Sequence, residues 1–450
     1  MMGVTCGAGR LLVAMALLLL AACSGGNSSS GSTSFGGSTS SSGGSGGSTT
    51  SSSGGTAPLT NFAAITVDAG PAALNVGANA YTATNVPYVT VTVCAPGSAT
   101  NCQTVDHVLL DTGSTGLRLE ASALKPALLA GLGGQTDPAG NGIGECYQFV
   151  DNFVFGSVRT ADFSIGGESV AAMPLMLIGD TGGGFATVPK SCSASGGTNM
   201  NTVQGLGANG IIGVGLSPLD CGSACTTTNG AGGAIYYDCP ATGCANVVAR
   251  AQTAGAPFEQ LPNPVAAFAL DNNGTIVSLP AVPAAGVVTL AGTITFGIGT
   301  QTNNGLGNAT VLPANRSGEI TATYKGTVLT SSFIDSGSNY YYFTDSITQC
   351  TQAVLKGFYC PASPLALTPV LTGSGGGTAS AAFTLYNAFS GPGSTSNAVP
   401  GIGADPAALA FSQPINNSFD FGLPFFFGRT VYTAIAGRQA GTRAGPYFAF

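Results

Sequence analysis

Two short segments, far apart in the chain, place an aspartate in the same chemical setting. The two turns are Asp111-Thr112-Gly113-Ser114 and Asp335-Ser336-Gly337-Ser338. An apolar run leads into each turn and another follows it. A strand can deliver the carboxylate to a fixed point, the glycine lets the chain turn back tightly, and the hydroxyl groups can hydrogen-bond the carboxylate. Two carboxylates brought together in this way could perform general acid–base chemistry.

The tripeptide alone is weak support, because a chain with 69 glycines produces such turns by chance. A third copy exists at Asp180-Thr181-Gly182, but it lacks both the following serine and the apolar return strand. The hypothesis therefore depends on the flanking strands and on the duplication.

The elements that would position these turns are strands. Short Val, Ile, Thr and Phe runs are separated by Gly, Asn and Pro, which is typical of an all-β fold. The chain is long for one core, so we expect two lobes. The expected divisions are a signal peptide over 1–22, a tether over 23–58, a first lobe over 59–275 and a second lobe over 276–450.

Further segments occur in an order that resembles the pepsin-like aspartic proteases. They are Pro87–Val93 and Gln103–Val108 before the first turn, Cys146-Tyr147-Gln148 and Gly156, Asn209–Leu216, Phe296–Gly299, and Phe421–Tyr432 near the end. The resemblance runs from about residue 80 to the C-terminus. It implies a bilobed fold with the active-site cleft between the lobes.

The resemblance also implies a mechanism and roles. Asp111 and Asp335 would share one proton, because like charges that close cannot both ionise cheaply. Thr112 and Ser336 would brace the two loops, Ser114 and Ser338 would hydrogen-bond the carboxylates, and Tyr147 would close over a peptide or protein substrate. Neither a metal nor a cofactor is needed.

The chain also departs from that family. Thr115–Arg118 follows the first turn where the family has other residues, and no Trp is present for the flap tyrosine to lean on. The aspartates are 224 positions apart (335 minus 111), longer than usual, and Cys221–Cys244 would supply the excess. No basic prosegment precedes the first lobe, so zymogen control of the family's usual kind is not expected.

Two strings, Asp111–Leu119 and Gly422–Arg429, resemble an uncharacterised family of bacterial exported proteins. That resemblance keeps a catalytically inactive binding protein open as an alternative. A structural envelope or surface protein is a third possibility, although it leaves the twin turns unexplained. A Ser/His/Asp hydrolase is disfavoured, because His107 is the single histidine and no Gly-x-Ser-x-Gly elbow is present.

The first residues predict export and a lipid anchor. The apolar run Leu11–Ala22 is too short to span a bilayer and ends at Cys23 in a sequence that resembles a bacterial lipobox. The Ser/Gly/Thr-rich stretch that follows Cys23 cannot form a core and should act as a tether. We expect a lipidated Cys23, attachment to a membrane, and a periplasmic or cell-surface location.

The chain has twelve cysteines, and ten are left once Cys6 and Cys23 are set aside. In an exported protein these ten should pair as disulfides. The expected pairs are Cys94–Cys102, Cys146–Cys192, Cys350–Cys360 and two among Cys221, Cys225, Cys239 and Cys244. A zinc site is the competing interpretation, which the cysteine spacing and the lone histidine disfavour.

The charge of the chain argues against nucleic acid as a partner. The net charge is −7, and no Lys or Arg lies between Arg10 and Arg118, which disfavours nucleic-acid binding. We expect a monomer. His107 is expected to be structural, and Arg118 is expected to be solvated or structural rather than a cleft residue that binds a substrate carboxylate.

Overall fold

The computed structural model describes most of the chain after the predicted tether. The described residues are 61–77, 80–194, 197–222, 225, 234–244, 246–247, 260–391, 396–409, 411, 415 and 417–450. The expected signal peptide, the tether and Cys23 lie outside them.

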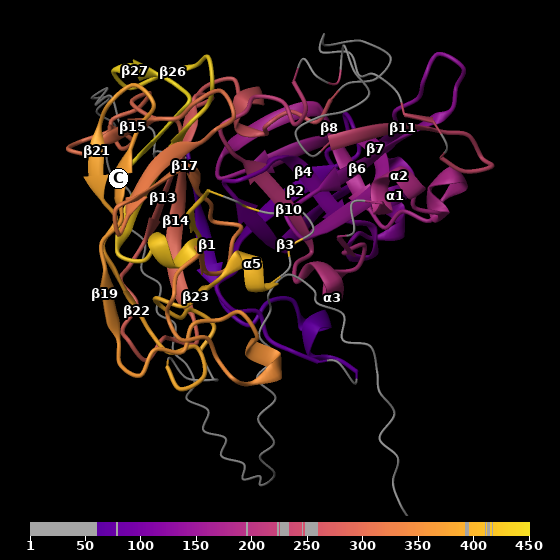
Figure 1. The fold of residues 1–450 in the computed structure, drawn as a ribbon. Helices are drawn as coiled ribbons and strands as arrows, with labels where there is room; N and C mark the ends of the chain where they lie inside the picture. Colours follow the sequence, from indigo (N-terminus) through magenta and orange to yellow (C-terminus); the bar gives the residue numbers. More distant parts are fainter. Residues whose placement is uncertain are drawn as a thin grey trace, which may run out of the picture.

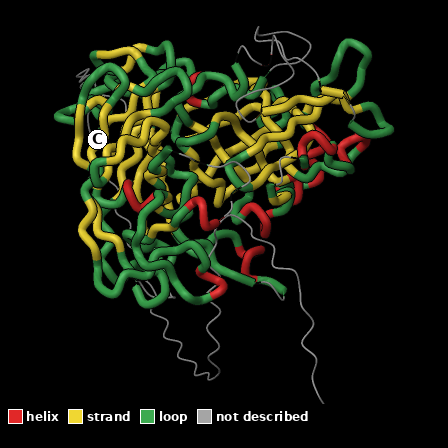
Figure 2. Tube along the Cα trace, in the orientation of Figure 1, coloured by secondary structure: helices red, strands yellow, loops and turns green. Residues whose placement is uncertain are grey.

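The regular structure of the described chain is mostly strand, joined by many loops and turns, in two lobes that Figures 1 and 2 show side by side. The predicted all-β, bilobed pepsin-like fold is confirmed. Strands of the first half are β2 (Pro87–Cys94), β3 (Cys102–Asp111), β4 (Thr115–Glu120), β5 (Gly133–Gly134), β6 (Gly142–Gln148), β7 (Asn152–Ile165), β8 (Glu168–Ile178), β9 (Thr198–Asn199), β10 (Gly210–Val214), β11 (Ala234–Cys239) and β12 (Asn246–Val247). Those that surround the second aspartate are β16 (Ile320–Tyr324), β17 (Thr327–Ile334), β18 (Tyr341–Tyr342), β20 (Val370–Thr372), β21 (Thr378–Ser380), β23 (Gly403–Ala404) and β24 (Asp420–Phe421).

Helices are few and short in the described part of the chain. They are α1 (Pro126–Gly131), α2 (Lys190–Ser193), α3 (Val203–Leu206) and α5 (Pro406–Leu409). Among the described residues, no helix is long and apolar enough to cross a membrane.

Each half holds its aspartate with the same strand arrangement. In the first half, β10 runs parallel to β3 and antiparallel to β4, so that it lies between the two strands that flank the turn at Asp111. In the second half, β24 runs parallel to β17 and antiparallel to β18 around the turn at Asp335. The inserted strands are buried, β10 along its whole length. A rigid, dry support of this kind fixes each carboxylate more tightly than a free loop would.

One sheet connects the two halves. The N-terminal strand β1 (Phe62–Val67) pairs with β2 of the first half and with β14 (Leu290–Phe296) of the second. Strand β14 continues through β13 (Gly274–Leu279) to β25 (Arg429–Ala434). The main hydrophobic core accordingly contains residues of both halves, including Leu110 and Ile334 just before the two aspartates. The exact domain boundaries given above stay predictions.

Five disulfides are present, and the sequence-based pairings are confirmed. They are Cys94–Cys102, Cys146–Cys192, Cys221–Cys225, Cys239–Cys244 and Cys350–Cys360. The pair Cys146–Cys192 attaches strand β6 to helix α2, so it fixes the hairpin that overhangs the site.

Candidate active site

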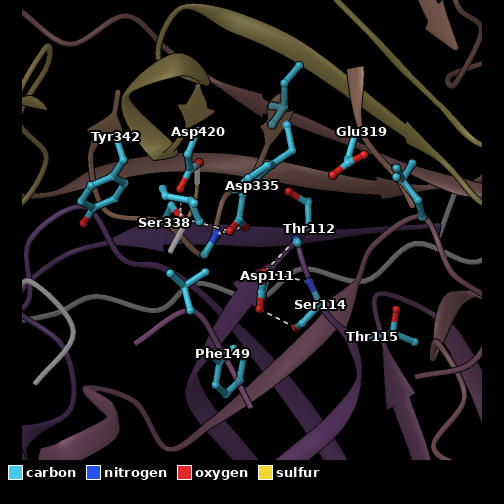
Figure 3. Close-up of a pocket in the computed structure, with 18 of the residues that line it drawn as sticks. Asp111, Thr112, Ser114, Thr115, Phe149, Glu319, Asp335, Ser338, Tyr342 and Asp420 are labelled. Carbon is cyan, nitrogen blue, oxygen red and sulfur yellow. Dashed lines mark hydrogen bonds between the residues drawn. The ribbon is translucent and has the colours of Figure 1, made fainter. Parts of the chain in front are cut away.

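The two aspartates meet between the lobes, although 224 positions separate them in sequence (Figure 3). Strand β3 ends at Asp111, and strand β17 ends one residue before Asp335. Asp111 is buried and Asp335 is half-buried, and both line the floor of a common cleft. The structure therefore brings together the two carboxylates that the sequence singled out.

The glycine of each turn leaves room for the aspartate of the other turn. A Cβ atom on Gly113 would lie 2.6 Å from Cγ of Asp335. A Cβ atom on Gly337 would lie 2.6 Å from Oδ1 of Asp111. Any side chain at either glycine would displace the opposite carboxylate, so the two turns can approach only because both positions are glycine.

The two turns also bond to each other, each through a backbone amide that donates to a side-chain hydroxyl of the other turn. The amide of Thr112 donates to Oγ of Ser336 at 3.1 Å, and the amide of Ser336 donates to Oγ1 of Thr112 at 2.9 Å. The Ser336 hydroxyl in turn donates to the carbonyl of Leu110 at 2.7 Å. These buried bonds fix the distance between the lobes at the point where the carboxylates lie.

The two carboxylates have different hydrogen-bond environments. Asp111 accepts bonds from the amides of Gly113 (2.8 Å) and Ser114 (3.2 Å) and from the Ser114 hydroxyl. Asp335 accepts bonds from the amide of Gly337 (2.7 Å) and from the Ser338 hydroxyl (3.0 Å). Burial, the neighbouring Asp111 and a third acid, Asp420, raise the pKa of Asp335 well above its ordinary value. Asp335 is thus suited to hold a proton.

A cleft of about 590 Å³ opens over the aspartates. The hairpin of β6 and β7 overhangs it, with Tyr147, Gln148 and Phe149 in the lining. Leu216 and Phe448 contribute apolar wall from elsewhere in the chain. A cleft of this size, with a few polar groups on an apolar wall, fits a small part of an extended ligand.

Tyr147 lies on strand β6 of this hairpin, where a flap tyrosine was expected, and its ring contacts an arginine. The guanidinium carbon of Arg118 lies 3.7 Å from the centre of the Tyr147 ring. Arg118 is fully buried and bonds Glu145 at 2.6 Å. The Arg118 cation therefore packs against the face of the Tyr147 ring.

This placement corrects one of the two roles expected for Arg118. The residue is not solvated: its side chain is fully buried, and its other contacts are Asp220 at 3.5 Å and the carbonyl of Thr115 at 2.8 Å. The structural role is the one observed. Sequence reasoning missed the cluster because Glu145 and Asp220 lie 27 and 102 positions from Arg118 and approach it only in the folded chain.

The other residues weighed from sequence lie elsewhere. His107 does not line the cleft and has Asp68 and Asp106 within 3.4 Å. The third tripeptide also lies outside the cleft, where Asp180 bonds Arg159 at 2.7 Å. Within the described ranges, no group of three or more His, Cys, Asp and Glu side chains is arranged to hold a metal ion.

Asp420 is the site residue that the sequence did not reveal. It lines the cleft on strand β24, is buried, and accepts a bond from the Ser338 hydroxyl at 2.7 Å. The available indication was its position: an acid interrupts the apolar run Phe419–Phe421 just before Gly422, where the first half has Ile211 and Ile212 before Gly213.

The duplicated strand–aspartate–turn motif, with both aspartates at the floor of one cleft, defines a pepsin-like fold. Within that fold, the chain belongs to the family described as "Protein of unknown function (DUF3443)", which it matches over residues 57–450. A comparison with curated proteins found no match. Among solved structures, the aspartic proteinase from Irpex lacteus matches at 12% identity and a TM-score of 0.47, covering 86% of this chain and 96% of that chain.

Proposed function

We propose that this protein is an aspartic-type endopeptidase that hydrolyses extended peptides with water activated by Asp111 and Asp335. The observation that carries the proposal is the meeting of these two carboxylates from different lobes at the floor of an open cleft. Paired carboxylates with different environments are what general acid–base hydrolysis requires.

The hydrogen bonds support an assignment of the two roles. Asp111 accepts three donors and acts as the base. Asp335, which accepts two and lies beside another acid, carries the proton and acts as the acid. The pair titrates as a unit, so this assignment describes the dominant arrangement of one shared proton.

The reaction then balances without any other group. Water between the carboxylates gives a proton to Asp111 as its oxygen attacks the peptide carbonyl. Asp335 gives its proton to the carbonyl oxygen, which forms a neutral tetrahedral diol. The C–N bond breaks as Asp111 passes its proton to the leaving nitrogen, and a hydroxyl proton of the diol returns to Asp335. The free enzyme is restored with one proton on the pair.

The proposal is tested by peptide cleavage across acid to neutral pH. Asp111→Asn and Asp335→Asn should each lower kcat/KM by roughly 100-fold or more, the usual size of a lost acid or base. Asp180→Asn is the matched control, since it changes an aspartate in the same tripeptide outside the cleft and should leave cleavage near the wild-type rate. If either variant kept its activity, the proposed catalytic role of the two aspartates would be refuted.

A catalytically inactive binding protein is the alternative. Its motivation is the changed support of Tyr147, which rests on a buried arginine. A statine-type transition-state mimic separates the two, because tight binding of such a mimic depends on the shared proton. If the wild type neither cleaves peptides nor binds the mimic, the result favours the binding protein.

We further propose that the protein acts as an exported monomer attached to a membrane through a lipid on Cys23. The five disulfides support an oxidising compartment. Cys23→Ser should move the protein from the membrane fraction to the soluble fraction of cells. An unchanged distribution would contradict the anchor. Sedimentation of the released form should give the mass of a single chain.

A further inference from the structure

Asp420 occupies a position where the first half of the molecule has an apolar residue. On β24, Asp420 pairs with Phe333 of β17, two residues before Asp335. The equivalent residue on β10 is Ile211, which pairs with Leu109, two residues before Asp111. The fold therefore accepts a buried aliphatic side chain here, and support of the strand does not require an acid. A buried acid that packing does not need is costly and marks a functional position.

The Ser338 hydroxyl joins this acid to the proposed dyad. Its oxygen lies 3.0 Å from Oδ2 of Asp335 and 2.7 Å from Oδ2 of Asp420 (Figure 3). A serine hydroxyl has one proton and can donate one full bond. Both contacts are satisfied only if one of the two carboxyls is protonated and donates to the serine oxygen. The geometry thus requires a proton on Asp335 or Asp420.

The surroundings of Asp420 favour a proton there. Its side chain is 3% exposed, and no donor in the described part of the chain reaches Oδ1. The titratable groups that face it are Asp335 beyond β17, Tyr342 directly opposite on β18, and Asp111 from the other lobe. Burial and the Asp111 charge raise the pKa of Asp420 well above its ordinary value. The described lining of the cleft contains no Lys, Arg or His that would counter this.

We propose that Asp420 is a positioning residue that shares a proton with Asp335 through Ser338 and so keeps Asp335 protonated at higher pH. This inference rests on the proposed peptidase function. The exchange is balanced: Oδ2 of Asp420 passes a proton to the serine oxygen, while the serine proton moves to Oδ2 of Asp335. When one of the two acids ionises, the other retains a proton, and the like charge nearby opposes its loss.

The test is the pH profile of kcat/KM in Asp420→Asn. Asparagine keeps the shape and can still bond Ser338, but it cannot exchange a proton. The fall in activity at high pH should move to lower pH by roughly one unit, the size of a close charge effect, while kcat at acid pH stays within a few fold. Asp405→Asn is the control, an aspartate of the same lobe outside the cleft that bonds Thr344 and Gln349. Superimposable profiles for wild type and Asp420→Asn would overturn the proposal.

A second variant and a second measurement keep the test decisive. Asp420→Leu restores the residue type of the equivalent position in the other lobe, should fold, and should show the same shift. Infrared absorption of protonated carboxyl groups near neutral pH should lose intensity in Asp420→Asn and not in Asp405→Asn. If the wild type cleaves no peptide, the peptidase function fails while the infrared comparison still decides the protonation of Asp420. An unchanged infrared band would refute it.

Discussion

The buried charges beneath Tyr147 predict a stability defect with a defined pH dependence. Arg118 lies 2.6 Å from Glu145 and 3.5 Å from Asp220, and all three side chains are fully buried. Burial and the Glu145 carboxylate raise the pKa of Asp220 well above its ordinary value, so Asp220 holds a proton. The cluster then contains one positive and one negative charge. Replacement of Arg118 by methionine leaves the negative charge alone in the interior.

The expected size follows from other buried pairs. Removal of one partner costs about 3–5 kcal/mol, because the remaining charge keeps its desolvation penalty. Urea unfolding of Arg118→Met at neutral pH should show a loss of that order. A buried carboxyl without a cation takes up a proton as the pH falls, so the loss should shrink in acid. Arg118→Met/Glu145→Gln removes both charges and should recover most of the stability.

The same two variants separate stability from flap support. Both lose the cation that lies 3.7 Å from the Tyr147 ring, a contact that is worth about 1–2 kcal/mol when desolvated. Peptide cleavage, or affinity for a statine-type mimic, should therefore fall by roughly tenfold in both, including the restabilised double variant. A double variant no more stable than the single one would refute the electrostatic reasoning. Wild-type affinity in the double variant would refute the flap role.

Two further outcomes are expected. Burial raises the pKa of Glu120 from 4.5 to about 9, so unfolding releases its proton above pH 4.5 and stability declines from there to about pH 9. At pH 7 the free energy of unfolding of Glu120→Gln should exceed that of the wild type by about 3 kcal/mol. Near pH 4 the two free energies should be equal. Urea titration at both pH values measures the difference. Ser336→Ala removes the acceptor of the Thr112 amide bond, and steady-state kinetics should show a lower kcat with little change in KM, whereas a change confined to KM would contradict this.

The sequence was sufficient to single out the two aspartates that meet in the cleft, because the needed information is local and repeated. Each aspartate stands in a turn whose strand, glycine and hydroxyl residues are adjacent to it, so two copies are recognisable without tertiary structure. The disulfide pairs were also predictable, because most join cysteines ten or fewer positions apart. The partners of Arg118 were not, since Glu145 and Asp220 are 27 and 102 positions away and reach it only in the folded sheet.

Asp420 was missed for a related reason. Its run of residues is apolar except for the acid, and only the strand register shows that it corresponds to Ile211. Once the two halves are aligned by register, their differences become informative. Arg118 on β4 pairs with Ile211, and Tyr342 on β18 pairs with Asp420. The first half thus places a buried cation against Tyr147, and the second half places a buried acid beside the proposed catalytic acid.

These buried acids connect the proposed chemistry with the pH dependence of stability. Burial raises the pKa values of Glu120, Asp220, Asp335 and Asp420. Unfolding exposes all four, so each releases a proton on unfolding once the pH exceeds its ordinary pKa, and stability then declines as the pH rises. Hydrogen bonds and an ion pair lower the pKa of the half-buried Asp180, whose contribution to stability is lost only in stronger acid. The fold is therefore most stable on the acid side of neutrality, where Asp335 keeps the proton that peptide hydrolysis needs.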